Sequence, residues 1–308
     1  MPREKSGIPV LVRAGLLVRA CRWPFTVIAL FPFLLGALSP GGPWLPAPFL
    51  LGLIAVLAGA VTSHLVNDYA DSKSGVDWRD PRDFQFFGGS KLIQQGRLTE
   101  RDYLRAGIAT SLVALAAIVG LALLRHAPFI LLIVTGVLLI AWQYTAKPLQ
   151  LAYRYAGEAV VFFCYGPVST LAGSYTQTGI PFSGDGLLLS LPMGLMGAGV
   201  LFANEVPDYP DDIAGGKRTL VHLTGPARAW LLYTALVLAT GGLVVGLVAH
   251  GLLRPIGLAA LAAGLPAGLA ARVLARSWAD KTALLTSSKL TIAAHVLLSL
   301  GLLLGAWR

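Results

Sequence analysis

The sequence predicts an all-α integral membrane protein with nine transmembrane helices. Of the 308 residues, 56% are hydrophobic and only 13% are charged, whereas soluble domains carry about 25% charged residues. The apolar residues form windows of about 20 residues, which is long enough to cross a bilayer as a helix. Lys and Arg are concentrated in alternate connections between these windows. Together these observations exclude an ordinary soluble enzyme, a solenoid and a disordered chain.

The apolar windows divide the chain into nine spans with short or polar connections. They cover residues 22–39, 47–66, 102–124, 127–145, 156–175, 186–204, 228–249, 252–271 and 288–307. The preceding residues 1–21 are basic and lack a signal-peptide cleavage site, so we expect a retained N-terminal segment. Cys21 and Cys164 lie in apolar stretches and show no disulfide or metal spacing.

The positive charges predict the orientation of the spans. Of the 24 Lys and Arg residues, all but Arg125, Arg254 and Arg308 fall on one side of the membrane in this arrangement. Because cytoplasmic loops carry the excess of Lys and Arg, the N-terminus and the loops after the even-numbered spans are predicted to be cytoplasmic. The net charge of +9 is then explained by the orientation of the protein in the plasma (inner) membrane. Because the basic residues are accounted for in this way, we expect no nucleic-acid partner.

Acidic residues gather where the second and sixth spans reach the cytoplasmic face. Eleven of the 15 lie in residues 68–102 and 205–212. This clustering is not needed for topology, because Asp and Glu contribute little to it. We therefore predict one domain, residues 1–308, with cytoplasmic active-site loops at 67–101 and 205–227.

The first acidic window reads NDYADSKSGVD from Asn67 to Asp77. If the second span continues as a helix, Asn67 and Asp71 are four residues apart and share one face, with Asp68 beside them. His64 lies one turn earlier, where it either faces the same site or makes a helix contact.

The second acidic window begins at Asn204 and reads NEVPDYPDD. The spacing places Asn204, Asp208 and Asp212 on one helical face over two turns. Pro207 and Pro210 are expected to bend or break this helix.

The order of residue types in both windows suits a metal-bound diphosphate. Packed carboxylates repel one another, and oxygen ligands favour Mg²⁺, which typically shares its coordination shell with phosphate. Each window is followed by glycines and basic residues, at 88–91 (GGSK) and 215–218 (GGKR), and Lys and Arg bind phosphate. The alternative is a solvated acidic loop balanced by neighbouring Lys and Arg.

The two windows also indicate an internal repeat. Asn67 ends the second predicted span and Asn204 ends the sixth, so the halves run parallel and the windows face the same side. We expect two parallel four-helix repeats with the site between them and a peripheral ninth helix.

These paired motifs resemble the UbiA superfamily of intramembrane prenyltransferases. The match rests on NDYADSKSGVD and on N-x3-D-x3-D-x3-G-K-x-T-L from Asn204 to Leu220. The N-D-x-x-D-x3-G-x-D spacing, KPLQLAYRYAGE (147–158) and GPVSTLAGSYTQTG (166–179) are most similar to the 1,4-dihydroxy-2-naphthoate polyprenyltransferases of menaquinone synthesis. The second motif departs from that branch: it reads NEVPD from Asn204 to Asp208, where the branch more often carries a second Asn and an Arg before the Asp.

The resemblance implies an Mg²⁺-dependent enzyme that transfers a polyprenyl group from an allylic diphosphate to an aromatic acceptor within the bilayer. No obligate protein partner is implied. The implied catalytic residues are Asp68, Asp71, Asp208 and Asp212. The implied metal ligands are Asn67, Asp68, Asp71, Asp77, Asn204, Asp208 and Asp212. The implied diphosphate contacts are Arg22, Asn67, Lys91, Tyr144, Lys147, Arg154, Asn204 and Lys217.

Several alternatives stay open at this stage. The acceptor is 4-hydroxybenzoate, homogentisate or a tetrapyrrole in other branches, and membrane terpene cyclases of the superfamily use no acceptor. A transporter would place its carboxylates at the membrane midplane and not at span ends. For Glu158, an ion pair with Arg154 one turn earlier is the simplest interpretation.

Overall fold

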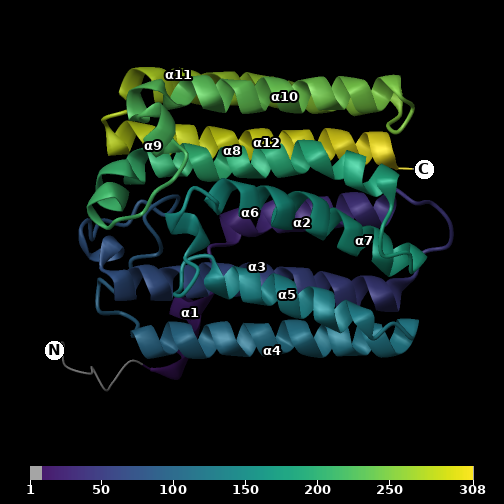
Figure 1. The fold of residues 1–308 in the computed structure, drawn as a ribbon, viewed down its shortest axis with the longest axis horizontal. Helices are drawn as coiled ribbons and strands as arrows, with labels where there is room; N and C mark the ends of the chain where they lie inside the picture. Colours follow the sequence, from purple (N-terminus) through teal and green to yellow (C-terminus); the bar gives the residue numbers. More distant parts are fainter. Residues whose placement is uncertain (1–8, 308) are drawn as a thin grey trace.

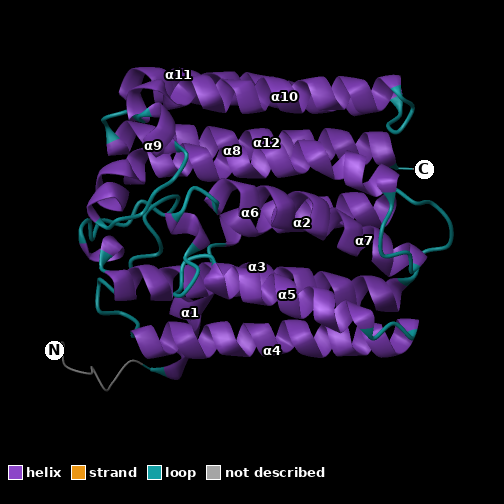
Figure 2. Cartoon of the chain, in the orientation of Figure 1, coloured by secondary structure: helices purple, strands orange, loops and turns teal. Residues whose placement is uncertain are grey.

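The structure, a computed structural model, describes residues 9–307. The described residues form helices joined by loops, without a β-strand, and the long helices lie side by side in stacked layers (Figures 1 and 2). Residues 1–8 of the predicted basic N-terminal segment, and Arg308, lie outside the described residues.

The helices follow one another along the chain with few long connections. The first half contains α1 (Val10–Ala20), α2 (Trp23–Leu38), α3 (Pro46–Ser74), η1 (Val76–Trp78), α4 (Glu100–Arg125), α5 (Phe129–Gln143), η2 (Leu151–Tyr153), α6 (Gly157–Phe163), the π-helical turn η3 (Cys164–Val168) and α7 (Ser169–Thr178). The second half contains α8 (Gly184–Ala214), α9 (Val221–Thr224), η4 (Pro226–Arg228), α10 (Ala229–Ala249), η5 (Pro255–Ala263), α11 (Gly264–Ser277) and α12 (Lys281–Ala306).

Six helical segments of the described chain are long and apolar enough to cross a membrane. They are Pro46–Ser74, Glu100–Arg125, Gly184–Ala214, Pro226–Ala249, Pro255–Ser277 and Lys281–Ala306. A seventh is reached if α1 and α2, which meet at an angle of 57°, form one bent span. The α5 helix is shorter, and the predicted span at 156–175 is interrupted by η3. An all-helical membrane fold is therefore established, whereas the count of nine spans and the repeat stay predictions.

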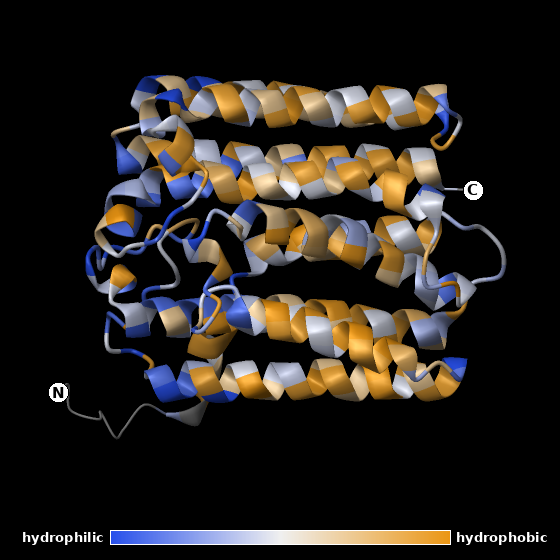
Figure 3. Ribbon diagram, viewed as in Figure 1, coloured by the Kyte–Doolittle hydropathy of each residue, from blue (hydrophilic) through white to orange (hydrophobic). Residues whose placement is uncertain are grey.

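Hydrophilic residues gather at one end of the bundle, where α3 and α8 both end (Figure 3). The long loop after α3 and the shorter connection after α8 lie together at this end (Figure 1). This arrangement brings the two acidic windows to the same end of the molecule.

The prolines at 207 and 210 were expected to bend or break α8, but the helix is not broken there and continues to Ala214. Each proline removes one main-chain donor, but side chains hold the last turns in place. Asp208 accepts a hydrogen bond from the Gly88 N–H, and Asp211 accepts one from Lys281. These contacts to other elements offset the lost helical hydrogen bonds.

Glycines allow α2 and α7 to cross at very short range. A Cβ atom added to Gly36 would lie 1.8 Å from the Thr170 carbonyl oxygen, and one added to Gly173 would lie 2.0 Å from the Phe33 carbonyl oxygen. Any larger residue at either position would therefore force the two helices apart.

Candidate active site

A cavity of about 500 Å³ opens inside the bundle near its hydrophilic end. Polar side chains from both acidic windows line its mouth, and aliphatic and aromatic side chains line its depth. The apolar part includes Ile118, Leu121, Ile130, Val134, Leu138 and Tyr175. The shape suits a molecule with a charged head and an apolar tail.

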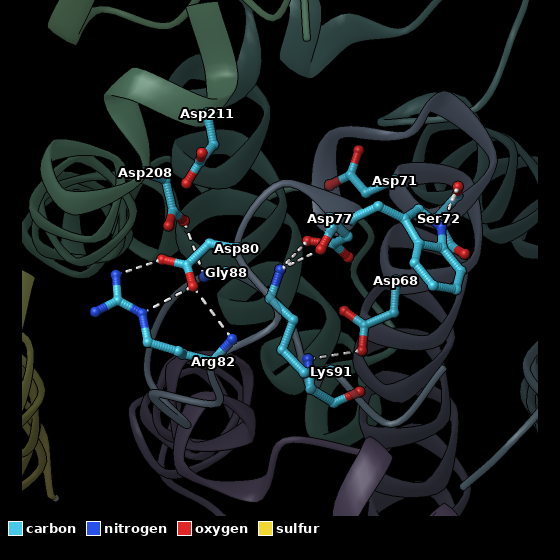
Figure 4. Close-up of polar contacts among 12 residues, drawn as sticks. Asp68, Asp71, Ser72, Asp77, Asp80, Arg82, Gly88, Lys91, Asp208 and Asp211 are labelled. Atoms are coloured by element: carbon cyan, nitrogen blue, oxygen red, sulfur yellow. Dashed lines mark hydrogen bonds and ion pairs between the residues drawn. The ribbon is translucent and has the colours of Figure 1, made fainter. Parts of the chain in front are cut away.

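The two acidic windows meet at the mouth of this cavity. The Gly88 N–H, in the loop after α3, donates to Asp208 Oδ2 at 2.9 Å. Lys281 Nζ, from α12, donates both to Asp80 Oδ2 at 2.9 Å and to Asp211 Oδ2 at 2.6 Å. Figure 4 shows Asp208 and Asp211 of α8 on one side of the view and Asp68, Asp71 and Asp77 on the other, with Gly88 next to Asp208.

The last turns of α3 present the face that the spacing predicts. Asn67 Nδ2 donates to Asp71 Oδ2 at 3.2 Å and to Thr145 Oγ1 at 2.7 Å. The Tyr153 hydroxyl donates to Asp71 Oδ1 at 2.8 Å. These bonds fix the orientation of the Asp71 carboxylate toward the cavity that it lines.

Asp68 lies under the glycine-rich loop that follows the first window. Its Oδ2 accepts a hydrogen bond from the Ser90 N–H at 3.0 Å, while its buried Oδ1 has no hydrogen-bond partner. Gly89 has a φ of +76°, and a Cβ there would lie 3.1 Å from Asp68 Oδ1 and 3.0 Å from Asp77 Oδ2. The missing side chain thus lets the main chain approach both carboxylates.

Asp77 and Lys91 form a buried ion pair beside these groups. Lys91 Nζ lies 2.9 Å from Asp77 Oδ1 and 2.9 Å from the Asp77 carbonyl oxygen. Burial, together with the charge of Asp71, nevertheless raises the pKa of the Asp77 carboxyl to about 8. The Lys91 ammonium group, which acts in the opposite direction, therefore does not outweigh the effect of burial and of Asp71 on Asp77.

The second window leaves oxygens free in the same region. Asp212 Oδ1 lies 3.5 Å from Lys217 Nζ, but Asp212 Oδ2 and Asn204 Oδ1 are buried without a partner. Burial alone would lower the pKa of Lys217, yet the charges of Asp212 and Asp71 outweigh it and raise that pKa well above its usual value. Lys217 is therefore a firmly charged ammonium group at the cavity.

These residues fit a magnesium ion that is completed by other ligands. Within residues 9–307, no group of three or more His, Cys, Asp or Glu side chains is close enough to form a metal cage alone. Buried oxygens without a hydrogen-bond partner include those of Asp68, Asn204 and Asp212, and the Asp68 oxygen lies 3.9 Å from Arg22. Mg²⁺ prefers such oxygen donors and takes its remaining ligands from water and substrate phosphate.

Most of the predicted site residues line the cavity. They are Arg22, Asn67, Asp71, Asp77, Lys91, Tyr144, Asn204, Asp208, Asp212 and Lys217. Asp68 is buried directly beneath Gly89. The structure does not bring Lys147 and Arg154 to the cavity, because both side chains are exposed on the connection after α5. The inner side of that connection is instead occupied by Thr145 and Tyr153.

The structure adds site residues that the sequence analysis did not find. Thr145 and Tyr153 hold the first window, and Lys281 joins both windows. Tyr153 lies within the stretch at 147–158 that resembles the family, which is the only sequence signal for it. His64 lines the cavity, with its ring 6.2 Å from the ring of Phe25.

The expected ion pair between Glu158 and Arg154 is not formed. Glu158 Oε1 accepts a hydrogen bond from the Leu220 N–H at 2.7 Å, and Arg154 donates to the Pro148 carbonyl oxygen at 3.4 Å. The break between η2 and α6 turns Arg154 outward, since helical i, i+4 spacing does not extend across it.

The fold and the site define an intramembrane protein that gathers carboxylates and lysines at the mouth of an apolar cavity. The sequence matches the UbiA prenyltransferase family over residues 29–295, so the chain belongs to this family. This finding confirms the resemblance that the paired motifs indicate.

Several relatives of this chain share one name. The chain is 35% identical to the 1,4-dihydroxy-2-naphthoate octaprenyltransferase of Mycobacterium tuberculosis, over 65% of this chain and 70% of that protein. It is 33% identical to the enzyme of the same name from Mycobacterium leprae, over 65% of each chain. The aligned part therefore spans about two thirds of these relatives.

Solved structures share the fold at lower sequence identity. A UbiA homologue from Aeropyrum pernix K1 matches with a TM-score of 0.64 at 22% identity, covering 90% of this chain and 96% of that one. A UbiA homologue from Archaeoglobus fulgidus, bound to GPP and Mg²⁺, matches with a TM-score of 0.57 at 16% identity, covering 92% and 99%.

Proposed function

We propose that this protein transfers a polyprenyl group from an allylic diphosphate to 1,4-dihydroxy-2-naphthoate in menaquinone biosynthesis. The observation that carries the proposal is the meeting of two acidic windows at the mouth of an apolar cavity, where Gly88 joins Asp208. The names of the mycobacterial relatives support the choice of acceptor.

We infer that the mouth of the cavity holds the diphosphate. Mg²⁺, when bound, would neutralise the charge of the diphosphate. The residues that would hold it are Asn67, Asp68, Asp71, Asp77, Asn204, Asp208 and Asp212, which offer the oxygen donors described above. Lys91, Lys217 and Arg22 line the same region and would stabilise the charge that develops on the leaving group.

The apolar depth of the cavity would protect the reactive carbon. When the allylic C–O bond breaks, its electron pair leaves with the diphosphate and a carbocation remains on the prenyl chain. The aliphatic walls exclude water from this cation. An electron-rich ring carbon of the acceptor then forms the new C–C bond. Loss of the acceptor's carboxylate as CO₂ accompanies the transfer and returns the electron pair of the broken bond to the ring.

We place the whole chain, residues 1–308, in one prenyltransferase domain with nine spans in the plasma membrane. The N-terminus and both loops, 67–101 and 205–227, would face the cytoplasm. The distribution of Lys and Arg supports this orientation, and so does the gathering of both loops at one end (Figure 1).

The experiment is a transfer assay with the purified full-length protein in lipid vesicles. Labelled polyprenyl diphosphate is offered with 1,4-dihydroxy-2-naphthoate, 4-hydroxybenzoate or homogentisate, with Mg²⁺ or with EDTA. We expect product with the naphthoate, and a loss of about 10²-fold or more in rate after chelation. Transfer to another acceptor would replace the naphthoate assignment, and a cyclised product without acceptor would indicate a terpene cyclase. Full activity in EDTA would overturn the metal assignment.

A further inference from the structure

Four consecutive residues in the loop after α3, 88–91 (GGSK), connect the two acidic windows. The Gly88 N–H donates to Asp208 Oδ2 at 2.9 Å, in the second window. The Ser90 N–H donates to Asp68 Oδ2 at 3.0 Å, in the first window. One short segment of main chain therefore holds a carboxylate from each half of the molecule.

The last residue of the same segment holds a third carboxylate with its side chain. Lys91 Nζ donates to Asp77 Oδ1 at 2.9 Å, and both groups are buried. In all three cases the donated hydrogen bond goes to one of the two carboxylate oxygens. The segment thus fixes the direction in which each carboxylate points.

This arrangement requires glycine at position 89. Gly89 has a φ of +76°, a conformation that residues with a side chain disfavour. A Cβ there would lie 3.0 Å from Asp77 Oδ2 and 3.1 Å from Asp68 Oδ1, both closer than ordinary van der Waals contact. A side chain at this position would therefore push the main chain away from the two carboxylates, and the hydrogen bonds on either side would weaken.

The segment is anchored on its other side to α4. The hydroxyl groups of Ser90 and Tyr103 are hydrogen-bonded to each other, and both side chains are buried. Leu92, directly after the segment, is fully buried in the same apolar cluster as Tyr103. The donors of the segment therefore act on the acids from a fixed position against the bundle.

We propose that residues 88–91 are a positioning segment, whose main chain and Lys91 side chain hold the carboxylates of both windows in the arrangement that binds metal and diphosphate. This inference rests on the proposed function. Loss of the groups that orient metal-ligating side chains typically lowers metal affinity by about 10–100-fold. The segment should therefore determine the Mg²⁺ requirement of the enzyme without affecting the affinity for the acceptor.

The test compares Gly89→Ala with Gly96→Ala in the purified full-length protein. Gly96 lies in the same loop with a φ of +66°, but nothing lies within 4 Å of a Cβ there, so its variant reports the effect of backbone strain alone. Binding of labelled inorganic pyrophosphate is measured at a series of Mg²⁺ concentrations, independently of turnover. The Mg²⁺ concentration for half-maximal transfer, the acceptor KM and the thermal midpoint without metal are measured in parallel.

We expect Gly89→Ala to raise the Mg²⁺ concentration for half-maximal pyrophosphate binding, and for half-maximal transfer, by about 10-fold or more. The acceptor KM should stay at the wild-type value, and Gly96→Ala should match the wild type. Ser90→Ala keeps the N–H donor but loses the bond to Tyr103, so it should raise the Mg²⁺ requirement several-fold.

A wild-type Mg²⁺ requirement in Gly89→Ala would overturn the inference, and so would an equal rise in Gly96→Ala or a parallel rise in the acceptor KM. If Gly89→Ala does not fold, Ser90→Ala decides, and a wild-type Mg²⁺ requirement there would also overturn the inference. Failure of the wild type to bind pyrophosphate in the presence of Mg²⁺ would instead overturn the proposed diphosphate site, so the two failures are distinguishable.

Discussion

Asp71 and Asp208 come from different helices but face one cavity. Asp71 accepts from the Tyr153 hydroxyl at 2.8 Å, and Asp208 from the Gly88 N–H at 2.9 Å. The Asp71 carboxylate also accepts from Asn67 Nδ2 at 3.2 Å. The carbonyl oxygen of an asparagine could nevertheless keep the bond to Tyr153 at position 71 or to Gly88 at position 208. Substitution by Asn therefore removes charge from the site while preserving the local hydrogen bond.

We expect Asp71→Asn and Asp208→Asn each to lower the rate of prenyl transfer by about 10²-fold or more, since charge at the developing leaving group is a large catalytic term. Transfer is measured at saturating Mg²⁺, and the elution profile in detergent checks the fold. Asp185→Asn, at an exposed acid at the other end of α8, serves as the matched control. Wild-type rates in both site variants would contradict their role.

At the residue scale, contacts between residues a few positions apart were predictable from the sequence, whereas contacts between distant residues were not. The face shared by Asn67 and Asp71 was predicted correctly because four residues make about one helical turn. Thr145 and Tyr153 contact the same face from 78 and 82 residues away, and no local pattern specifies such contacts. The sequence likewise does not specify that the connection between α5 and α6 turns the Lys147 side chain outward.

At the scale of elements, the crossing of α2 and α7 depends on two glycines. We expect Gly173→Val to lower the free energy of unfolding by about 1–3 kcal/mol, because a Cβ there meets the Phe33 carbonyl oxygen at 2.0 Å. The measurement is the thermal midpoint in detergent. Gly136→Val in α5 is the control, since nothing lies within 4 Å of a Cβ at that position. Equal midpoints for the two variants would contradict the close-contact explanation.

The elements themselves were largely predictable from composition. Helices occupy every predicted apolar window, because hydrophobic runs of this length form helices in a bilayer. The interruption at η3 and the continuity of α8 were missed. Pro167 lies inside the interrupted turn η3, whereas α8 continues through Pro207 and Pro210, so proline alone does not predict where a helix is interrupted.

At the scale of the whole molecule, Lys281 joins three distant parts of the chain. Its side chain is 19% exposed and bridges Asp80, after α3, to Asp211, in α8. We expect Lys281→Met to lower the free energy of unfolding by about 1–3 kcal/mol. This is more than the loss of an exposed ion pair costs and less than the loss of one partner of a fully buried pair. Thermal midpoints are compared with those of Lys281→Arg, which keeps the charge, and Arg276→Met, which removes an exposed cation on α11. If Lys281→Met matched Arg276→Met, the bridge would have no stabilising role.

The overall topology was predictable only in part. The parallel placement of the two acidic windows follows from an even number of spans between them, and both windows do lie at one end of the bundle (Figure 1). Counting spans is harder, because α5 is short and the α6–η3–α7 segment is interrupted. Length and hydropathy alone therefore give six or seven crossings.

The modest size of the cavity bears on how a long isoprenoid is accommodated. A volume of about 500 Å³ matches pockets that enclose a drug-sized molecule, and a chain of many isoprene units is larger than that. The far end of such a substrate would then extend beyond the cavity, among the lipid acyl chains. Selection for tail length would then fall to the synthase that makes the diphosphate, and the same catalyst would serve cells with menaquinones of different lengths.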